Sequence, residues 1–188
     1  MDRRAGRSVG VIETQMRSSE VNPPDSWERF EALYRTSRDD LFAYVMTLLR
    51  SREAAEDVTA LAFERAYRRR KTFDRRRGEE RAWLFGIARN AALDELRRRR
   101  RLATLHTDPQ DTAELPVEDG ADVALRRTAV RSALETLPAR EREVIALKFH
   151  ARLSNGELGK VLGMSETAAG TLLYRTMEKL RKACDAEH

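Results

Sequence analysis

Residues 79–101, EERAWLFGIARNAALDELRRRRR, combine an apolar stripe with five consecutive arginines. The apolar residues recur at steps of three and four, the spacing that places side chains on one side of an α-helix. They are Leu84, Ile87, Ala88, Ala91, Ala92 and Leu96. The arginines, residues 97–101, are either a phosphate-binding block or a solvated end that suits the negative pole of the helix dipole. This stretch therefore predicts an amphipathic helix with one buried face and another face available to a partner.

The composition of the 188-residue chain favours small helical units and an anionic partner. Charged residues make up 36% of the chain and aromatic residues 6%, so we expect small cores with wide solvated faces. The formal net charge is +5, but residues 64–101 alone hold fifteen lysines and arginines against six acidic residues. This basic segment points to nucleic acid or a membrane surface as the partner.

Other classes of protein and site are disfavoured by what the sequence lacks. One cysteine, Cys184, cannot form an intramolecular disulfide or a thiolate zinc cluster. The histidines His106, His150 and His188 show no metal-ligand spacing and no phosphate loop or nucleophile motif is present, so we expect no enzyme, metal or cofactor. The chain lacks both an apolar run of about 18 residues for membrane insertion and a secretory signal, which predicts a cytoplasmic protein.

We expect an all-α protein of two small helical domains joined by a flexible acidic linker. Residues 1–24 predict a disordered tail, with a partner-binding segment at residues 9–16 as the alternative. The first domain is predicted at residues 25–101 and should hold four helices and one basic loop. In chain order these are a helix capped by Asp25 or Ser26, a second amphipathic pattern at residues 41–49, a helix capped by Ser51, the loop at residues 73–80 and the helix at residues 79–101.

The linker is predicted at residues 102–122, where the composition changes abruptly. Residues 102–124 contain no lysine or arginine, and two prolines and a glycine interrupt any helix. The acidic groups of this segment are Asp108, Asp111, Glu114, Glu118, Asp119 and Asp122. The segment is either an inert tether or an acidic strand that shields the basic domain or lies in a basic channel of a partner.

The second domain, residues 123–185, is predicted to contain a helix-turn-helix. Helices are expected at residues 123–137 and 138–149. Ser154 begins a capping box before a short amphipathic helix, and Ser165 follows a glycine-containing turn as the N-cap of a long last helix. In a helix-turn-helix the second helix enters the major groove of DNA, although any αα-hairpin produces the same pattern.

Two blocks of the sequence resemble a bacterial RNA polymerase sigma factor of the extracytoplasmic-function (ECF) type, in the sigma-70 family. The first block consists of FEALYRTSRDDLFAYV (30–45), REAAEDVTALAFERAYRR (52–69) and FDRRRGEERAWLFGIARNAALDELRRR (73–99). The second consists of LETLPAREREVIALKF (134–149) and LSNGELGKVLGMSETAAGTLLYRTMEKLR (153–181). The resemblance covers roughly residues 27–182, apart from the linker.

The resemblance implies a non-enzymatic subunit that binds core RNA polymerase and promoter DNA, both as duplex and as melted strand. It also implies an anti-sigma factor as partner and a stress or envelope-response regulon. Residues 56–67 resemble the segment that docks on a coiled coil of the largest polymerase subunit. The candidate contacts are Asp57, Glu64 and Arg65, whereas Ala60 stands where the family often has glutamine.

The loop at residues 73–80 and the helix that follows resemble the part of the family that receives an unstacked base of the minus-ten element. Trp83 would stack on the displaced base, an interaction worth roughly 1–3 kcal/mol, or would instead belong to the core. Asn90 lies two helical turns further on, and its amide can pair with an adenine edge. The basic candidates for this surface are Arg76, Arg81, Arg89, Arg97 and Arg98, of which the last three are assigned to phosphate.

The predicted recognition helix departs from the family pattern. Residues 168–172, AAGTL, replace the common Thr-Val-Lys-Ser-Arg, so Gly170 and Leu172 stand at two positions that are usually basic. We therefore expect an unusual minus-thirty-five element, or weak recognition of that element. The candidate DNA contacts of the helix-turn-helix are Ser154, Ser165, Thr167, Ala168, Thr171, Arg175 and Lys179.

Two other functions stay open from the sequence. A repressor or activator would use the helix-turn-helix on duplex DNA without polymerase, but it leaves the basic loop and Trp83 unexplained. A sigma-like decoy would bind polymerase and no promoter, which the altered recognition helix allows.

Overall fold

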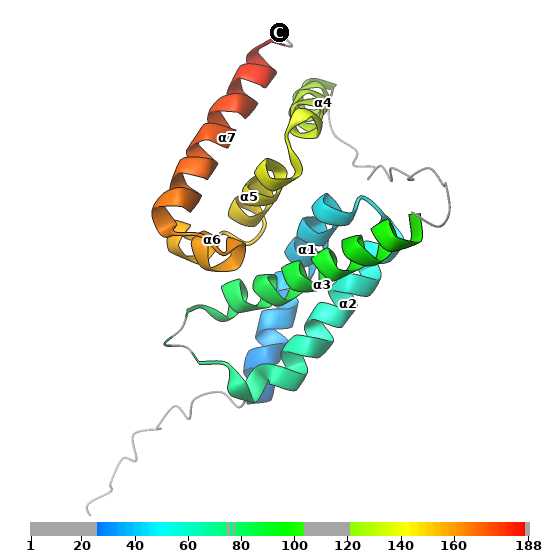
Figure 1. The fold of residues 1–188 in the computed structure, drawn as a ribbon, viewed down its shortest axis with the longest axis vertical. Helices are drawn as coiled ribbons and strands as arrows, with labels where there is room; N and C mark the ends of the chain where they lie inside the picture. Colours follow the sequence, from blue (N-terminus) through cyan, green and yellow to red (C-terminus); the bar gives the residue numbers. More distant parts are fainter. Residues whose placement is uncertain (1–25, 75, 77, 104–120, 187–188) are drawn as a thin grey trace, which may run out of the picture.

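The computed structural model describes residues 26–74, 76, 78–103 and 121–186, and its regular elements are helices. The N-terminal domain consists of α1 (Ser26–Leu49), α2 (Arg52–Arg69), the short 3-10 helix η1 (Arg70–Thr72) and α3 (Glu80–Ala103). The C-terminal domain consists of α4 (Ala121–Thr136), α5 (Ala139–Phe149), α6 (Asn155–Leu162) and α7 (Glu166–Ala186). Figure 1 shows the two domains stacked, with α5 and α6 on the side of α1 and α3. The expected N-terminal tail, the cap Asp25 and most of the expected linker lie outside the described residues.

The first helix is longer than the sequence pattern predicts. We expected two helices before residue 50, but α1 runs without a break from Ser26 to Leu49. Thr36 and Ser37 lie near the middle of this helix, and their hydroxyls form hydrogen bonds that do not cap a helix. Thr36 Oγ1 donates to the carbonyl of Ala32 at 2.8 Å, and the buried Ser37 Oγ accepts a hydrogen bond from Arg81 at 3.0 Å. Because neither side chain caps a new helix, the backbone continues as one.

Alanines allow the helices of the N-terminal domain to pack closely. The fully buried alanines of α2 and α3 are Ala55, Ala62, Ala66, Ala88 and Ala92. Short side chains at a helix contact permit small interaxial distances. Leu41 and Val45 of α1 and Leu84 of α3 are also fully buried and complete this core. The apolar stripe predicted for residues 79–101 is therefore confirmed as buried, except that Leu96 is partly buried.

Three helix boundaries differ from the sequence prediction. The helix predicted to end at residue 101 continues to Ala103, and α4 begins at Ala121, inside the segment predicted as linker. Pro138 precedes α5 instead of opening it, because its ψ of 149° is extended. Its carbonyl accepts hydrogen bonds from the backbone N–H groups of Glu141 and Arg142 and so starts the helix.

The predicted helix-turn-helix is present as α6, a tight turn and α7. Ser154 and Glu157 form the capping box, in which each side chain accepts from the backbone N–H of the other residue. Gly163 ends α6 with a φ of 69°, a conformation that suits glycine. Ser165 caps α7 by accepting from the backbone N–H of Ala168 at 3.2 Å. A Cβ at Gly159 would lie 2.8 Å from the carbonyl oxygen of Met164, so this glycine allows the close crossing of the two helices.

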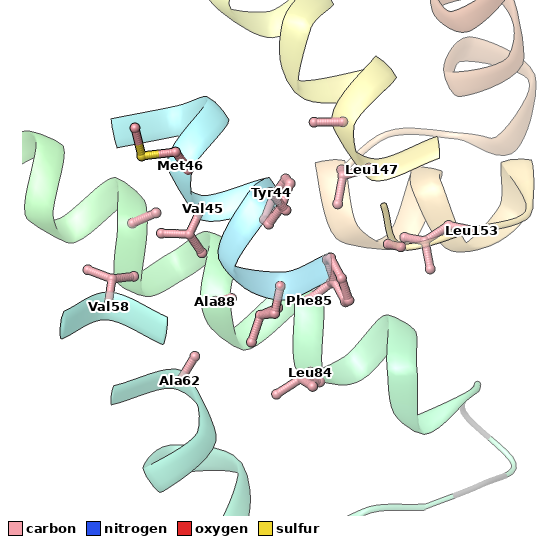
Figure 2. Packing of buried hydrophobic residues seen from close by; sticks show 14 of the residues in the cluster. Tyr44, Val45, Met46, Val58, Ala62, Leu84, Phe85, Ala88, Leu147 and Leu153 are labelled. Carbon is pink, nitrogen blue, oxygen red and sulfur yellow. The ribbon is translucent and has the colours of Figure 1, made fainter. Parts of the chain in front are cut away.

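The apolar cores of the two domains form one continuous cluster. Figure 2 shows Tyr44 of α1 and Phe85 of α3 near Leu147 of α5 and Leu153 in the following loop. The two rings lie 5.4 Å apart between centroids, and all four side chains are at most 2% exposed. The domains are thus packed on each other in this structure. None of the helices described is long and apolar enough to cross a bilayer.

Candidate nucleic-acid interface

A cleft of about 530 Å³ opens between the two domains. Its N-terminal wall consists of the segment before α3 and the exposed side of α3, including Trp83 and Asn90. Its C-terminal wall is α6, with Lys160 and Val161. The structure therefore brings the two residues that the sequence proposes for base recognition into one cleft, seven positions apart on one helix.

Trp83 combines features of the two roles expected from the sequence, a residue that stacks on a displaced base and a residue of the core. Its ring packs against the core, with the ring of Phe73 at a centroid distance of 5.2 Å and an interplanar angle of 45°. The residue is only half-buried and also lines the cleft. Asn90 is exposed, so its amide is accessible from the same side. This side of α3 therefore offers an aromatic ring and an amide together, the two groups that can stack on and pair with an unpaired base.

Arg81 joins three parts of the fold. Its Nη2 donates to Asp40 of α1 at 2.6 Å and to the backbone carbonyl of His150 at 2.6 Å. Its Nε donates to the carbonyl of Ala151 at 2.8 Å, and its Nη1 to Ser37 Oγ at 3.0 Å. A guanidinium at the C-terminal end of α5 also meets the negative pole of that helix. The sequence proposes Arg81 for promoter DNA, but in this structure each of its three nitrogens donates to a protein oxygen.

Arg89 lies in a second contact between the domains. Its Nε donates to Glu143 Oε1 at 2.7 Å, and the side chains are 20% and 8% exposed. The hydroxyl of Tyr44 donates to the same carboxylate oxygen at 3.3 Å. Burial raises the pKa of Tyr44 well above its usual range, and the charge of Glu143 adds to this effect. The phenol therefore stays protonated and donates to the carboxylate.

Glu143 is a key residue of this contact that the sequence analysis did not identify. The sequence does contain a pattern that could have indicated Glu143. Glu143 and Leu147 lie four positions apart in the segment predicted as a helix, and Val144 and Ile145 are also apolar, so a charged residue lies beside an apolar stripe. A carboxylate on a buried stripe predicts a cationic partner, because a buried charge without one is costly.

The arginines at the end of α3 pair with carboxylates of the same helix. Arg98 donates to both oxygens of Glu95 at 2.7 and 2.8 Å, Arg99 also bonds Glu95, and Arg97 bonds Asp94 at 3.0 Å. The hydrogen bond from Arg98 lowers the pKa of the Glu95 carboxyl. The side chains of Arg97 and Arg98 are mostly exposed, and exposed pairs contribute only about 0–1 kcal/mol. A phosphate group can therefore compete for these two arginines. Arg76 is exposed as well, in the loop before α3.

The segment proposed for polymerase docking forms the outer side of α2. Asp57, Ala60 and Glu64 are exposed, and Arg65 is half-buried. Glu64 forms an ion pair of 2.6 Å with Arg68 one turn further on. The helix thus presents acidic and basic groups to solvent on the side opposite its alanine face.

The start of α7 presents a mostly uncharged surface. Thr167, Ala168, Thr171, Arg175 and Lys179 are exposed as proposed, and Lys179 forms an ion pair with Glu141 of α5. The N-cap residues Ser154 and Ser165 are exposed too. These seven positions therefore lie on the surface, and the two serines also carry the capping hydrogen bonds.

Two features of α7 go beyond the sequence analysis. Tyr174 is 68% exposed and lies one turn after Thr171, so the helix carries an accessible aromatic ring that the sequence analysis did not propose. A Cβ at Gly170 would lie 3.1 Å from Asn155 Nδ2, so glycine at this position gives α6 close access to α7. Within the described residues, no group of three or more histidine, cysteine, aspartate or glutamate side chains could hold a metal ion.

Comparison with known families identifies two units in the chain. Residues 33–102 match the family model described as sigma-70 region 2, and residues 127–180 match the model described as sigma-70 region 4. These two segments correspond to the N-terminal and C-terminal domains of the structure.

Known sigma factors are similar to most of the chain, in sequence and in structure. The ECF RNA polymerase sigma factor BldN of Streptomyces coelicolor is 32% identical over 158 residues, which cover 82% of this chain and 60% of BldN. The ECF RNA polymerase sigma factor SigX of Bacillus subtilis is 32% identical over 166 residues, which cover 82% of this chain and 83% of SigX. The structure of CnrH in complex with the cytosolic domain of CnrY has a TM-score of 0.60 and 26% identity, and covers 86% of this chain and 91% of that chain.

Proposed function

The chain belongs to the sigma-70 family as an RNA polymerase sigma factor of the ECF type, and from that premise we propose which of its surfaces meet the promoter and the polymerase. Sigma factors are non-catalytic subunits that direct transcription initiation.

Region 2 is proposed to recognise and open the minus-ten element with the exposed side of α3. The observation that carries this proposal is that Trp83 and Asn90 lie on the same side of α3, where neither is fully buried. Trp83 would stack on an unpaired base and Asn90 would bond an adenine edge. Arg76, Arg97 and Arg98 are exposed basic groups near or along the same helix and would hold the strand by its phosphates.

Region 4 is proposed to read the minus-thirty-five element with the first turns of α7. Thr167, Ala168 and Thr171 are exposed there and can contact thymine methyl groups or phosphates. Arg175 and Lys179 would bind the DNA backbone, together with the N-cap residues Ser154 and Ser165. Gly170 and Leu172 offer no basic side chain for guanine, so the element read by this helix should differ from that of relatives with arginine or lysine there.

The polymerase is proposed to dock on α2. Asp57 and Glu64 lie on the exposed side of this helix, with Arg65 at its edge. The solved structure of CnrH contains the cytosolic domain of CnrY, and for this chain we propose an anti-sigma factor as a further partner. Since RNA polymerase works in the cytoplasm, we propose that location for the protein, together with a stress or envelope-response regulon.

The test adds the purified full chain to core RNA polymerase and a library of promoter fragments, followed by sequencing of the transcripts. Discrete start sites with shared upstream elements are expected. Polymerase binding without dependent transcripts would favour a decoy, and an absence of polymerase binding would favour a stand-alone DNA-binding regulator. Substitution of Trp83 by alanine should reduce transcription from duplex promoters more than from promoters with an already mismatched minus-ten region, because the latter need no strand opening.

A further inference from the structure

One face of α5 and of the loop after it provides the contact with the N-terminal domain. Glu143, Leu147 and Ala151 follow one another at steps of four, and all three are buried. The carboxylate of Glu143 accepts from Arg89 and Tyr44, and the carbonyl of Ala151 accepts from Arg81. Leu147, between them in sequence, belongs to the joint core and is drawn beside Tyr44 in Figure 2.

This interface is polar and specific at both ends. Glu143 is nearly buried, so separation from Arg89 would leave a carboxylate without its cationic partner until water reaches it. At the other end, Arg81 binds two carbonyl oxygens at the C-terminus of α5 while its Nη2 also bonds Asp40. The guanidinium of Arg81 is planar and its hydrogen bonds are directional. Because its acceptors come from both domains, these bonds favour one relative orientation of the domains.

The same interface engages the side of α3 that is proposed for DNA. Arg81 and Arg89 flank Trp83 on α3, and both donate to oxygens of the C-terminal domain. The cleft that remains, about 530 Å³, has the size of a small-molecule pocket. Because α6 forms the far wall of the cleft, the C-terminal domain lies opposite Trp83 and Asn90 and narrows the approach of a DNA strand to this side of α3.

We propose that this structure is a closed state in which α5 occupies Arg81 and Arg89, and that the Glu143 contact inhibits promoter binding until the domains separate. The inhibition rests on the proposed function of α3, whereas the closed contact itself does not. If the open state is the binding-competent one, the apparent dissociation constant for promoter DNA equals the intrinsic constant divided by the open fraction. A substitution that weakens the contact should therefore tighten apparent binding.

Glu143→Gln in the full chain tests the contact, because it removes the charge that pairs with Arg89 and keeps the shape. Domain separation is measured by energy transfer between dyes on cysteines introduced at Glu53 of α2 and Asp185 of α7, with Cys184 changed to serine. We expect lower transfer efficiency for the variant. The matched control is Glu141→Gln on the same helix, which removes an ion pair with Lys179 inside the C-terminal domain and should leave the transfer efficiency unchanged. Equal efficiency in Glu143→Gln and the control would overturn the proposal.

The inhibitory effect is measured with core polymerase and a promoter fragment. If about nine molecules in ten are closed, Glu143→Gln should bind the promoter complex up to about tenfold more tightly than the unchanged chain. Opening without tighter binding would overturn the inhibitory role. If no variant supports promoter binding, the proposed function fails instead, while the transfer measurement still reports on the closed contact.

A charge exchange keeps the test valid if Glu143→Gln does not fold. Arg89→Glu places two carboxylates against each other and should open the domains. The double variant Arg89→Glu with Glu143→Arg restores opposite charges and should recover the transfer efficiency of the unchanged chain. A double variant that stays as open as Arg89→Glu would show that this pair does not hold the domains together.

Discussion

At the scale of single residues, α3 combines groups that the fold already uses with groups that stay accessible. Arg81 and Arg89 are held by Asp40, by Glu143 and by the C-terminal end of α5. Asn90 is exposed in the cleft. The amide is therefore the side chain of this helix best placed to distinguish one base from another.

Asn90→Ala should abolish recognition at one base position of the promoter. The bidentate hydrogen bonding that the variant removes is worth about 1–3 kcal/mol, because only an adenine edge offers the matching donor and acceptor. The measurement is transcription from a panel of promoters in which each base of the minus-ten element is substituted in turn. Equal loss on every promoter would contradict base recognition and would point to a defect in folding or polymerase binding.

His150 should have a pKa below its usual value. The ring is partly buried, which disfavours the charged form, while the nearby Asp40 acts weakly in the opposite direction. A lowered folded-state pKa means that the contribution of the neutral ring to stability is complete above about pH 6.5 and is lost as the pH falls through the folded pKa.

The check is an NMR titration of the ring together with urea unfolding at pH 7.5 and 5.5. His150→Gln should reduce the loss of stability between these pH values, since glutamine does not titrate. The substitution leaves all other titratable side chains in place, so the difference between the two proteins reports on the histidine. A ring that titrates at or above pH 6.5 would contradict the prediction.

At the scale of elements, the helices are held at distances set by their smallest residues. Alanines line the contact of α2 with α3, and Gly159 and Gly170 lie at the crossing of α6 with α7. The helix ends are also set by local interactions. Ser51, Ser154 and Ser165 cap N-termini with their hydroxyls, and Gly163 ends α6 in a left-handed conformation.

Gly159→Ala should destabilise the C-terminal domain by about 1–3 kcal/mol. Its Cβ would lie 2.8 Å from the backbone oxygen of Met164 and 3.2 Å from the backbone nitrogen of Glu166, and backbone cannot move aside as a flexible side chain can. The control is Gly86→Ala in α3, where the Cβ meets nothing within 4 Å. This control should gain up to about 1 kcal/mol from helix propensity. Urea unfolding measures both, and a neutral Gly159→Ala would refute the close crossing.

Charge reversal of both Arg97 and Arg98 should flatten the salt dependence of promoter binding. Removal of one phosphate interaction with duplex DNA lowers the log–log slope by about 0.9, because fewer counterions are released. The matched control reverses Arg35 and Arg38, which are exposed on α1 and change the net charge equally. The measurement is the promoter binding constant at salt concentrations between about 50 and 200 mM, from which the slope of log K against log salt concentration is obtained. Equal slopes for the two double variants would argue against phosphate binding at the end of α3.

At the scale of the whole molecule, the two domains share one core and two polar contacts. The joint cluster includes Tyr44 and Phe85 on one side and Leu147 and Leu153 on the other. Arg81 and Arg89 supply the orientation, since their hydrogen bonds are directional. Closure therefore combines non-specific apolar burial with contacts that fix a single arrangement.

Leu147→Ala should weaken both the C-terminal domain and its contact with α1. Truncation of a fully buried leucine costs about 2–5 kcal/mol, through reduced burial and the remaining cavity. We expect the unfolding of the chain to separate into two transitions, because the C-terminal domain then melts first. Calorimetry checks this, with Leu172→Ala, a half-buried position on α7, as the comparison that should cost less. A single transition at the original temperature would contradict a shared core.

The sequence by itself determined the features that depend on neighbours along the chain. The buried stripe of α3, the capping box at Ser154 and the turn at Gly163 all follow from local periodicity and local hydrogen bonding. The helix-turn-helix follows from the same local signals, whereas the membership in the sigma-70 family rests on the resemblance of two sequence blocks to regions 2 and 4. The break expected within α1 was wrong: the helix is continuous, and its buried Ser37 accepts a hydrogen bond from Arg81 of α3.

Tertiary structure alone decided how the two domains meet. Arg89 and Glu143 are 54 positions apart, and no period within one helix specifies that such residues will pair. From the sequence, Arg81 was expected to be available to DNA, whereas in the structure its acceptors come from α1 and from the end of α5. The physical reason is that a helix pattern fixes which face is buried but leaves open what covers it. That choice depends on the fit of shape and charge between elements brought together only by folding.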